Sequence, residues 1–392
     1  MDQPVRSGRL AGRIRLPGSK SIAQRALVLA SHKGGQVRNV PDNDDLDRLC
    51  SALRALGYDI TVKGNTRVID GSLHEERVYL DLGGNGTGAR TVMALAALRG
   101  APTTVDGSQR LRRRPIAPLC DALRQLGARV DSNEFPVTIR GPIKGGAVRV
   151  DTSISSQFAT ALILIVDRVR GLKVHVTGRE SFSYVALTTL LQRTFKTPFV
   201  VEPDFSSAAA HAVAAATTGG DLLLDGLWLS SAQPDARLLP FLNRAGAKVT
   251  DTDDGVRVRG GPLRGIRVDL SNCPDLAPLF GVLGALSDGV TTIIGAPHLV
   301  HKESNRIEAT VEMIRALGGD AAARPDGFEV RGGLPLKGTT VSACGDHRIA
   351  MAAGVLALSV PGVTVADAEA VSKSYPTFFE DLERLTVSDG GS

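Results

Sequence analysis

The chain has 392 residues, of which 43% are apolar, 22% charged and 4% aromatic. This length allows two or three domains, and the composition is that of an ordinary globular protein. The low aromatic content argues against a protein that stacks on nucleic-acid bases. The formal net charge of +5 is modest for this length and suits small anionic substrates as well as larger partners.

The cysteines and the apolar runs exclude two further classes. Cys50, Cys120, Cys273 and Cys344 form no CxxC pair, so the sequence predicts neither a zinc site nor a redox motif. The N-terminus has no apolar stretch typical of a signal peptide, and the run ALILIV at 161–166 is far shorter than the roughly 20 residues of a membrane span. We expect a cytoplasmic protein with reduced thiols and no membrane partner.

The first predicted helix follows the stretch LPGSKS, residues 16–21. Lys20 directly precedes Ser21, and Arg25 follows one turn later. Two cations and a hydroxyl at a helix N-terminus suit a phosphate or a carboxylate. The stretch is not a Walker A loop, because Ser19 rather than glycine precedes Lys20.

The same pattern recurs along the chain, and this repetition predicts the architecture. A helix of small apolar residues is followed by a glycine-containing break, a β-branched strand and a second helix. The markers of the six helix starts are Ser21, Thr87, Ser156, Ser207, Asp275 and Asp346. The first helix of each unit is apolar nearly all round, which is typical of buried helices. A repeated N-cap residue is the simpler interpretation of any one marker, Ser207 for example.

The spacing of the markers predicts two domains. The markers are closest between Ser156 and Ser207, so we expect an α/β protein with a domain of residues 17–220 and a second of residues 1–16 plus 221–392. Each would contain three βαβαβ-type units around parallel helices. The chain would cross between them near 15–18 and 218–224, with Gly219–Gly220 as a hinge. Equivalent helices point the same way, so their N-termini would gather and strengthen anion binding.

Polar residues gather around these helix starts and in three short motifs. GGNGTGAR leaves bare backbone around Thr87, and GDHR places an acid, an imidazole and a guanidinium in consecutive positions. HKESNR and VSKSYP add further cations and one carboxylate. The arginine run RLRRRPI is explained equally well by a solvated basic face.

Together these motifs carry a resemblance to a known family. PGSKSxxxRAL, GTxxR, RPI, SISSQ, PD, KESxR, DHRxAM and SKSYP, in this order, resemble the 5-enolpyruvylshikimate-3-phosphate (EPSP) synthase family of enolpyruvyl transferases. The resemblance covers nearly the whole chain. It implies a two-domain inside-out α/β barrel built from six repeats, with the active site between the domains.

The resemblance also implies the reaction and its residues. The transferase would move the enolpyruvyl group of phosphoenolpyruvate to the 5-hydroxyl of shikimate 3-phosphate, by addition and elimination through a tetrahedral ketal. It would act as a monomer, without metal or cofactor. The implied catalytic residues are Lys20, Asp275, Glu303 and His347. Those implied to hold shikimate 3-phosphate are Ser21, Arg25, Ser155, Ser156, Gln157, Tyr184, Asp275 and Lys302. Those implied to hold phosphoenolpyruvate are Lys20, Gly86, Thr87, Arg114, Gln157, Arg306, Arg348 and Lys373.

Several positions depart from the family pattern. Gly84-Asn85 precedes the GT motif, Gly88 follows Thr87, Val300-His301 precedes Lys302, and His298 stands where asparagine is common. These departures leave open an enzyme of specialised metabolism that acts on a different shikimate-like or cyclic acceptor.

Three other functions explain the sequence less completely. The enolpyruvyl transferase that acts on UDP-N-acetylglucosamine relies on a loop cysteine, whereas Cys120 lies in a helical pattern. A dehydrogenase is suggested by GNGTGA at 84–89, which fits G-x-G-x-x-A after a strand and with Asp106 downstream. That interpretation is weakened because the other helix starts lack the fingerprint. A non-catalytic binding module would not need Asp275, Glu303 and Lys20.

Two acidic clusters carry no metal motif. Residues 42–47 and 251–255 lack the ligand spacing of an EF-hand loop. The second cluster predicts a hairpin turn.

Overall fold

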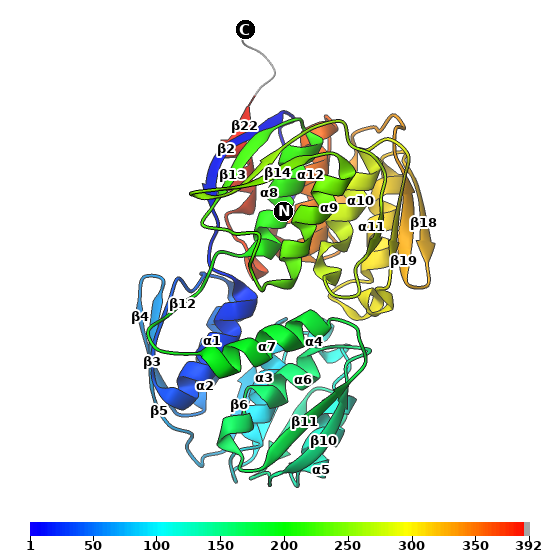
Figure 1. Cartoon of the computed structure of the whole chain (residues 1–392). Helices are drawn as coiled ribbons and strands as arrows, with labels where there is room; N and C mark the ends of the chain where they lie inside the picture. The colour runs from blue at the N-terminus through cyan, green and yellow to red at the C-terminus, as the bar shows by residue number, and fades with distance from the viewer. Residues whose placement is uncertain (388–392) are drawn as a thin grey trace. The chain divides into compact units, whose positions relative to one another are not determined.

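The computed structural model describes residues 1–387 and divides into two compact units (Figure 1). We call residues 18–202 the insert unit, because they interrupt the chain of the other. Residues 1–17 and 203–387 form the terminal unit.

The insert unit consists of short sheets with helices packed against them. Its helices are α1 (Lys20–Lys33), α2 (Asp44–Ala55), α3 (Gly86–Ala96), α4 (Gln109–Arg112), α5 (Ala117–Gln125), α6 (Gln157–Ile163), the 3₁₀ turn η1 (Val166–Arg168) and α7 (Phe182–Thr194). Its strands are β3 (Gly35–Arg38), β4 (Tyr58–Lys63), β5 (Thr66–Gly71), β6 (Val78–Asp81), β7 (Thr103–Asp106), β8 (Arg129–Val130), β9 (Val137–Arg140), β10 (Gly146–Asp151), β11 (Leu172–Thr177) and β12 (Phe199–Val200). The strand orders are β12-β3-β5-β4, β6-β7-β9-β8 and β10-β11.

The terminal unit is built in the same manner. Its helices are α8 (Phe205–Thr217), α9 (Leu238–Ala245), α10 (Ala277–Ala285), α11 (Arg306–Ala316), α12 (His347–Ser359) and α13 (Phe378–Leu385), with 3₁₀ turns η2 (Pro234–Arg237), η3 (Pro274–Leu276), η4 (Pro297–His301) and η5 (Ala368–Lys373). Its strands are β1 (Gln3–Pro4), β2 (Arg9–Arg15), β13 (Asp221–Asp225), β14 (Lys248–Thr252), β15 (Gly255–Arg259), β16 (Arg267–Asp269), β17 (Val290–Ile294), β18 (Asp320–Arg324), β19 (Gly327–Arg331), β20 (Thr340–Ser342), β21 (Thr364–Ala366) and β22 (Thr386–Val387). The strand orders are β14-β15-β13-β2-β22, β16-β17-β19-β18 and β1-β21-β20.

A parallel strand pair joined to an antiparallel hairpin recurs in both units. In the insert unit β6 runs parallel to β7, which pairs with the hairpin of β8 and β9. In the terminal unit β16 and β17 are followed by the hairpin of β18 and β19. The expected turn at 251–255 is the hairpin of β14 and β15, with Thr252 opposite Gly255. Within residues 1–387 the sheets are open, and none closes into a barrel.

Helices of small apolar residues fill the interior of each unit, as their composition predicted. Every residue of α10 is buried, and α10 packs against α8 and α12. In α8 the run from Ser207 to Ala216 is buried. Alanine and glycine let the helices approach closely, while leucine and valine supply the apolar area that stabilises the core. In the described part of the chain, no helix is both long and apolar enough to cross a membrane.

The expected second domain boundary at residue 220 is wrong, since the boundary lies between residues 202 and 203. Helix α8 packs on β2 and β13, both of the terminal unit, so it belongs to that unit. Gly219–Gly220 is therefore no hinge between units. A Cβ on Gly220 would lie 1.9 Å from the Leu10 carbonyl oxygen, so this glycine serves a close approach inside the terminal unit.

Side-chain caps begin several of the helices that carry polar residues. Asn85 accepts a hydrogen bond from the Gly88 N–H at the start of α3, and Asp346 accepts one from the Arg348 N–H at the start of α12. The start of α8 differs from the expectation. Asp204 is its cap, and Ser207, taken as the marker, lies in the first turn with its hydroxyl donated to Asp204. A carboxylate is the stronger acceptor for N–H groups at a helix start.

Candidate active site

In the insert unit, the starts of four helices are joined by side chains. Lys20 Nζ, at the start of α1, lies 2.8 Å from Asp45 Oδ2 in α2. The Asn85 side chain, which caps α3, donates to the Asp45 carbonyl oxygen at 2.6 Å. The Gln157 Nε2, at the start of α6, donates to Thr87 Oγ1 in α3 at 3.0 Å. The expected gathering of helix N-termini is therefore present in this unit.

Arg114 reaches this cluster from the loop before α5. Its Nη2 donates to Gln157 Oε1 at 3.4 Å. Gly86 makes the approach possible, because a Cβ there would lie 2.1 Å from Arg114 Nη1. Of the arginine run, Arg112 instead binds Asp106 with both Nε and Nη2. Only part of the run is therefore a solvated basic face.

Arg25 is a buried cation whose partners are neutral oxygens. Its guanidinium donates to Thr188 Oγ1 at 2.8 Å, to the Ser21 hydroxyl and carbonyl at 2.8 Å each, and to Thr160 Oγ1 at 3.4 Å. Burial lowers the pKa of Arg25 to about 10, although the Tyr184 phenol opposes the shift. At neutral pH the group keeps its charge, and that charge is left for an anionic ligand to neutralise.

Ser155 and Ser156 flank the start of α6. The Ser155 hydroxyl accepts the Gln157 N–H at 3.3 Å, whereas Ser156 is the N-cap residue without a side-chain cap bond. Tyr184 lies in α7 with its ring 6.0 Å from the Arg25 guanidinium carbon. These expected ligand residues therefore surround Arg25 and the start of α6.

In the terminal unit, Arg306 holds two carboxylates. Its Nε and Nη2 donate to Asp346 at 2.8 Å and 3.1 Å, and its Nη1 donates to Asp275 at 2.8 Å. Arg306 and Asp346 are 2% and 0% exposed, so water screens this pair weakly. Burial opposes the charge, but both carboxylates outweigh it and raise the pKa of Arg306.

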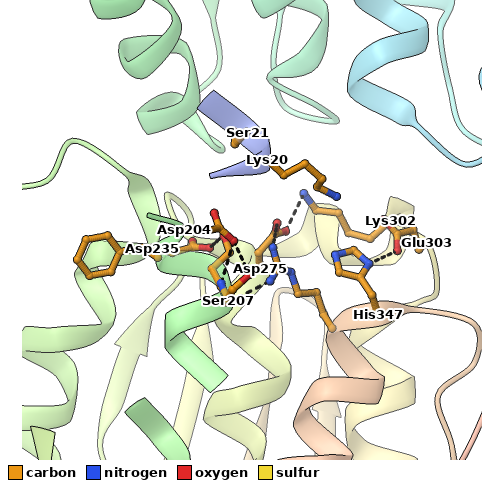
Figure 2. A network of polar contacts seen from close by, with 12 residues as sticks. Lys20, Ser21, Asp204, Ser207, Asp235, Asp275, Lys302, Glu303 and His347 are labelled. Carbon is orange, nitrogen blue, oxygen red and sulfur yellow. Dashed lines mark hydrogen bonds and ion pairs between the residues drawn. The ribbon is translucent and has the colours of Figure 1, made fainter. Parts of the chain in front are cut away.

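Glu303 lies between Lys373 and His347, and Figure 2 shows its contact with His347. Its Oε1 is 2.8 Å from Lys373 Nζ, and its Oε2 is 2.7 Å from His347 Nδ1. Burial disfavours the carboxylate, yet His347 and Lys373 together hold the pKa of Glu303 well below its usual value. In the ligand-free protein this carboxyl is therefore ionised.

Asp275 has three cationic neighbours, two of them at longer range. Lys302 Nζ is 3.8 Å from Oδ1 (Figure 2), and Arg348 Nη2 is 3.8 Å from Oδ2, in addition to the closer Arg306. Burial raises the pKa of Asp275, but Arg306 and Lys302 outweigh it and hold the pKa well below the ordinary value. Arg348 Nη1 also donates to the Ser206 carbonyl oxygen at 3.1 Å, which joins the starts of α12 and α8.

Glu303, Asp346 and His347 present ligand atoms within 4.8 Å of one another, a spacing that could hold a metal ion. Lys373 and Arg306 already bind the two carboxylates, and their positive charges disfavour a second cation there. The adjoining cations, rather than these three donors, are therefore the groups that could attract an anionic ligand.

The structure places the predicted residues in two clusters, each within one unit. Lys20, Ser21, Arg25, Gly86, Thr87, Arg114, Ser155, Ser156, Gln157 and Tyr184 belong to the insert unit, and Asp275, Lys302, Glu303, Arg306, His347, Arg348 and Lys373 to the terminal unit. Four polar residues beside these clusters were not predicted as site residues. Asp45 binds Lys20, Asn85 caps α3, and Asp204 and Asp235 accept hydrogen bonds from Ser207 and Ser206. An acid or amide just before a helix was the available signal for Asn85 and Asp204.

Two competing interpretations lose support from the geometry. Asp106, the acid expected to bind a ribose in a dehydrogenase, is occupied by Arg112 and by the Tyr79 hydroxyl at 2.7 Å. Cys120 lies inside α5, and burial raises the pKa of its thiol to about 11. It is thus unlike a reactive loop cysteine.

The family model and two relatives of similar sequence carry the same enzyme name. The chain matches the model of EPSP synthase (3-phosphoshikimate 1-carboxyvinyltransferase) over residues 5–198 and 191–382. It is 37% identical to the 3-phosphoshikimate 1-carboxyvinyltransferase of Syntrophobacter fumaroxidans, over 96% of this chain and 97% of the relative. The enzyme of the same name from Methanothermobacter thermautotrophicus is 35% identical over 98% of both chains.

Solved structures agree on the fold. EPSP synthase from Acinetobacter baumannii superposes with a TM-score of 0.78 at 22% identity, over 99% of this chain and 98% of that one. The enolpyruvyl transferase NikO from Streptomyces tendae gives 0.74 at 19% identity, over 98% and 97%. From its sequence matches over nearly the whole length, the chain belongs to the EPSP synthase (3-phosphoshikimate 1-carboxyvinyltransferase) family.

Proposed function

We propose that the protein transfers the enolpyruvyl group of phosphoenolpyruvate to the 5-hydroxyl of shikimate 3-phosphate and releases phosphate. The observation that carries this proposal is the position of Glu303, bound by Lys373 at 2.8 Å and by His347 at 2.7 Å. A carboxylate bound by a cation and an imidazole can exchange a proton with a substrate carbon.

Shikimate 3-phosphate would bind to the insert unit through Arg25. Its guanidinium is buried and charged, and its hydrogen bonds within residues 1–387 go to neutral oxygens. A phosphate would add charge-assisted hydrogen bonds that these oxygens do not provide. Ser21, Ser155, Ser156, Gln157 and Tyr184 would complete the grip, and Lys302 and Asp275 would contribute from the terminal unit.

Phosphoenolpyruvate would bind to Lys20, Gly86, Thr87, Gln157 and Arg114 of the insert unit, and to Arg306, Arg348 and Lys373 of the terminal unit. Arg348 is the guanidinium with the looser carboxylate contact, 3.8 Å to Asp275. Its Nε is buried and has no hydrogen-bond partner among residues 1–387. An incoming carboxylate or phosphate would satisfy that group.

In the addition step, Asp275 would take the proton of the 5-hydroxyl while the oxygen attacks the central carbon of the enol. The methylene carbon would gain a proton and become a methyl group, giving the tetrahedral phosphate ketal. In the elimination step, removal of a methyl proton would expel phosphate and restore the double bond. Glu303 would deliver and remove this proton, supported by His347 and Lys20.

The lowered pKa values of both acids set a condition on this mechanism. A strongly ion-paired carboxylate is a weak base. Anionic ligands on Arg306, Arg348 and Lys373 would compensate these cations, and the pKa values of Asp275 and Glu303 would then rise. Substrate binding would thereby activate both groups.

The active site would require both units, since each supplies only part of the residue set. We therefore expect anionic substrates to draw the units together, as in other hinge enzymes. Small-angle scattering with and without both substrates should show compaction, and an unchanged profile would contradict closure. The six recurring helix starts support a six-repeat inside-out barrel as the architecture. The protein would act as a cytoplasmic monomer.

The deciding experiment is phosphate release from phosphoenolpyruvate with shikimate 3-phosphate as acceptor. The wild type should turn over, and Glu303→Gln should lose about 10² to 10⁴ in kcat because the acid–base group is absent. Glu312→Gln, the same change at a glutamate within α11, should retain activity. Turnover by Glu303→Gln at the wild-type rate would contradict the assigned role.

A different acceptor is the second candidate. His298 is buried, and burial together with Lys302 lowers its pKa to about 3, so a neutral imidazole stands where the family commonly has asparagine. Absent turnover with shikimate 3-phosphate, combined with turnover of another cyclic alcohol in an acceptor panel, would favour this candidate.

A further inference from the structure

Asp235 is a buried carboxyl group that the mechanism above does not use. It lies in η2 of the terminal unit and is 1% exposed. Its Oδ2 accepts a hydrogen bond from the Ser206 hydroxyl, and its Oδ1 has no hydrogen-bond partner in the described chain. A buried carboxylate with half of its acceptor capacity unused is costly, so the position calls for an explanation.

The loop holds this carboxyl firmly against the start of α8. The side chain of Gln233, two residues earlier, accepts the Phe205 N–H at 3.0 Å and donates to the Pro203 carbonyl at 2.7 Å. Figure 2 shows Asp235 beside Asp204 and Asp275. The hydrogen bonds of Gln233 therefore fix the loop in a position where the Asp235 carboxyl group lies near two others.

Ser206 connects Asp235 to Arg348. The serine hydroxyl donates to Asp235, while the serine carbonyl accepts from Arg348 Nη1 at 3.1 Å. The charges of Asp275, Asp204 and Asp235 together oppose the desolvation of Arg348 and raise its pKa. Asp235 is thus part of the electrostatic environment of this guanidinium.

Of the three carboxyl groups around Arg348, Asp235 is the least compensated. Asp275 is bound by Arg306 at 2.8 Å, and Asp204 accepts both the N–H and the hydroxyl of Ser207 at the positive end of α8. Asp235 has one serine hydroxyl. When neighbouring acids compete, the least compensated one retains a proton.

We propose that Asp235 is a positioning residue that sets the charge around Arg348: it holds a proton while an anion occupies Arg348 and competes with that anion when it is ionised. The proposal rests on the proposed function only for the identity of the anion, phosphoenolpyruvate. Asp235 itself needs no contact with substrate.

The electrostatics agree in direction. Burial, and second the charge of Asp275, raise the pKa of Asp235 to about 7, against the opposing effects of Arg348 and the Ser206 hydroxyl. The other titratable neighbours leave this balance intact, because burial keeps the Cys273 thiol neutral by raising its pKa, and Arg237 is exposed to solvent. Asp235 would therefore change charge in the neutral range.

The KM for phosphoenolpyruvate should report this charge. Below the pKa of Asp235 the neutral acid leaves Arg348 available, and above it the carboxylate weakens anion binding. We expect the ratio of the wild-type KM to the KM of Asp235→Asn to rise about tenfold between roughly pH 5.5 and pH 8.5. A tenfold change corresponds to a shift of about one unit in the pKa of Asp235 when the anion binds. Titration of phosphoenolpyruvate itself cancels in this ratio. kcat should change less than KM.

Two further variants sharpen the test. Ser206→Ala removes the donor that favours the ionised form, so the rise in KM should move to higher pH. Asp320→Asn makes the same change at an acid that is 60% exposed, and its profile should follow the wild type. A constant KM ratio for Asp235→Asn at every pH would overturn the proposal.

Infrared spectroscopy of the ligand-free protein supplies a readout that needs no turnover. The carbonyl band of a protonated carboxylic acid should titrate near neutral pH in the wild type and in Asp320→Asn, and should be absent in Asp235→Asn. A band that persists in Asp235→Asn would overturn the proposal, even if the wild type does not turn over shikimate 3-phosphate. A titrating band without turnover would instead reject the proposed acceptor alone.

Discussion

Arg306 and Asp346 form a buried two-point ion pair, with Nε 2.8 Å from Oδ2 and Nη2 3.1 Å from Oδ1. The same guanidinium holds Asp275 at 2.8 Å, while Asp346 caps α12. One arginine therefore orients an expected catalytic acid and ties the start of α11 to that of α12. Only a planar, forked cation can make all three contacts at once.

Replacing Arg306 with lysine should expose this dependence. Arg306→Lys keeps the charge but loses the fork, so the free energy of unfolding should fall by about 1–3 kcal/mol and kcat by at least about a hundredfold. Denaturant unfolding and phosphate release measure the two effects. Arg331→Lys, at a site that is 61% exposed, should change neither. Wild-type kcat in Arg306→Lys would show that the fork is not required.

Gly86→Ala should disturb the cluster of the insert unit. The new Cβ would meet Arg114 Nη1 at 2.1 Å and displace the guanidinium. We expect the KM for phosphoenolpyruvate to rise by about tenfold or more, which corresponds to about 1.4 kcal/mol of binding. Gly127→Ala is the control, because its new Cβ would have no atom within 4 Å. This variant carries the backbone cost of alanine at a positive-φ glycine without displacing a side chain, so its KM should stay near the wild-type value. A Gly86→Ala KM equal to that of the wild type would mean that Arg114 does not bind this substrate.

Arg25→Lys should weaken the binding of shikimate 3-phosphate. An ammonium group cannot reach Thr188, Ser21 and Thr160 together, and it lacks the bidentate grip on phosphate. The KM for shikimate 3-phosphate should rise about ten- to a hundredfold, with a smaller change in the KM for phosphoenolpyruvate. Arg193→Lys, on the exposed side of α7, is the matched control. Equal changes in both KM values would argue against the assignment of Arg25 to one substrate.

Asp106 should contribute to stability against acid. The hydrogen bonds from Arg112 hold its pKa at about 2, although burial opposes them. The pKa of an aspartate in the unfolded chain is about 3.9, so the stabilisation by Asp106 is complete above that pH and is lost as the pH falls toward about 2. Asp106→Asn should lower stability at neutral pH and flatten its decline below about pH 4, as measured by chemical unfolding. A variant curve parallel to that of the wild type would contradict the ion pair.

Cys120→Ala should leave catalysis intact. The thiol is buried in α5 with its pKa raised to about 11 by burial, and an inert thiol is not a nucleophile or proton donor at neutral pH. We expect kcat within about twofold of the wild type, with a stability loss on the order of 1 kcal/mol from the vacated volume. A complete loss of activity in a folded variant would revive the mechanism that depends on a cysteine.

The arginine run at 110–114 illustrates what a sequence pattern leaves undecided. The run predicts cationic character, but its residues in α4 and in the turn after it have different partners. Arg112 binds Asp106 and Arg114 binds Gln157. Which arginine meets which partner depends on residues that are distant in the chain, and local spacing carries no information on them.

The acids beside the cations show the same limit. Asp45 belongs to an acidic cluster without a recognisable motif, yet its carboxylate lies 2.8 Å from Lys20. The domain boundary was misplaced for a related reason. The glycine pair at 219–220 has the composition of a hinge, whereas packing of α8 on β2 and β13 keeps it inside the terminal unit.

The sequence by itself determined the buried helices of small residues, the hairpin at 251–255, the cations at the helix starts and the family resemblance. These features are local, since they follow from side-chain volume, periodicity and short motifs. The tertiary structure decided which carboxylates neutralise Lys20, Arg306 and Lys373, and that Arg25 keeps neutral partners. Burial and long-range pairing arise only when distant segments pack together, and they set the charge of each group and thus what it can bind.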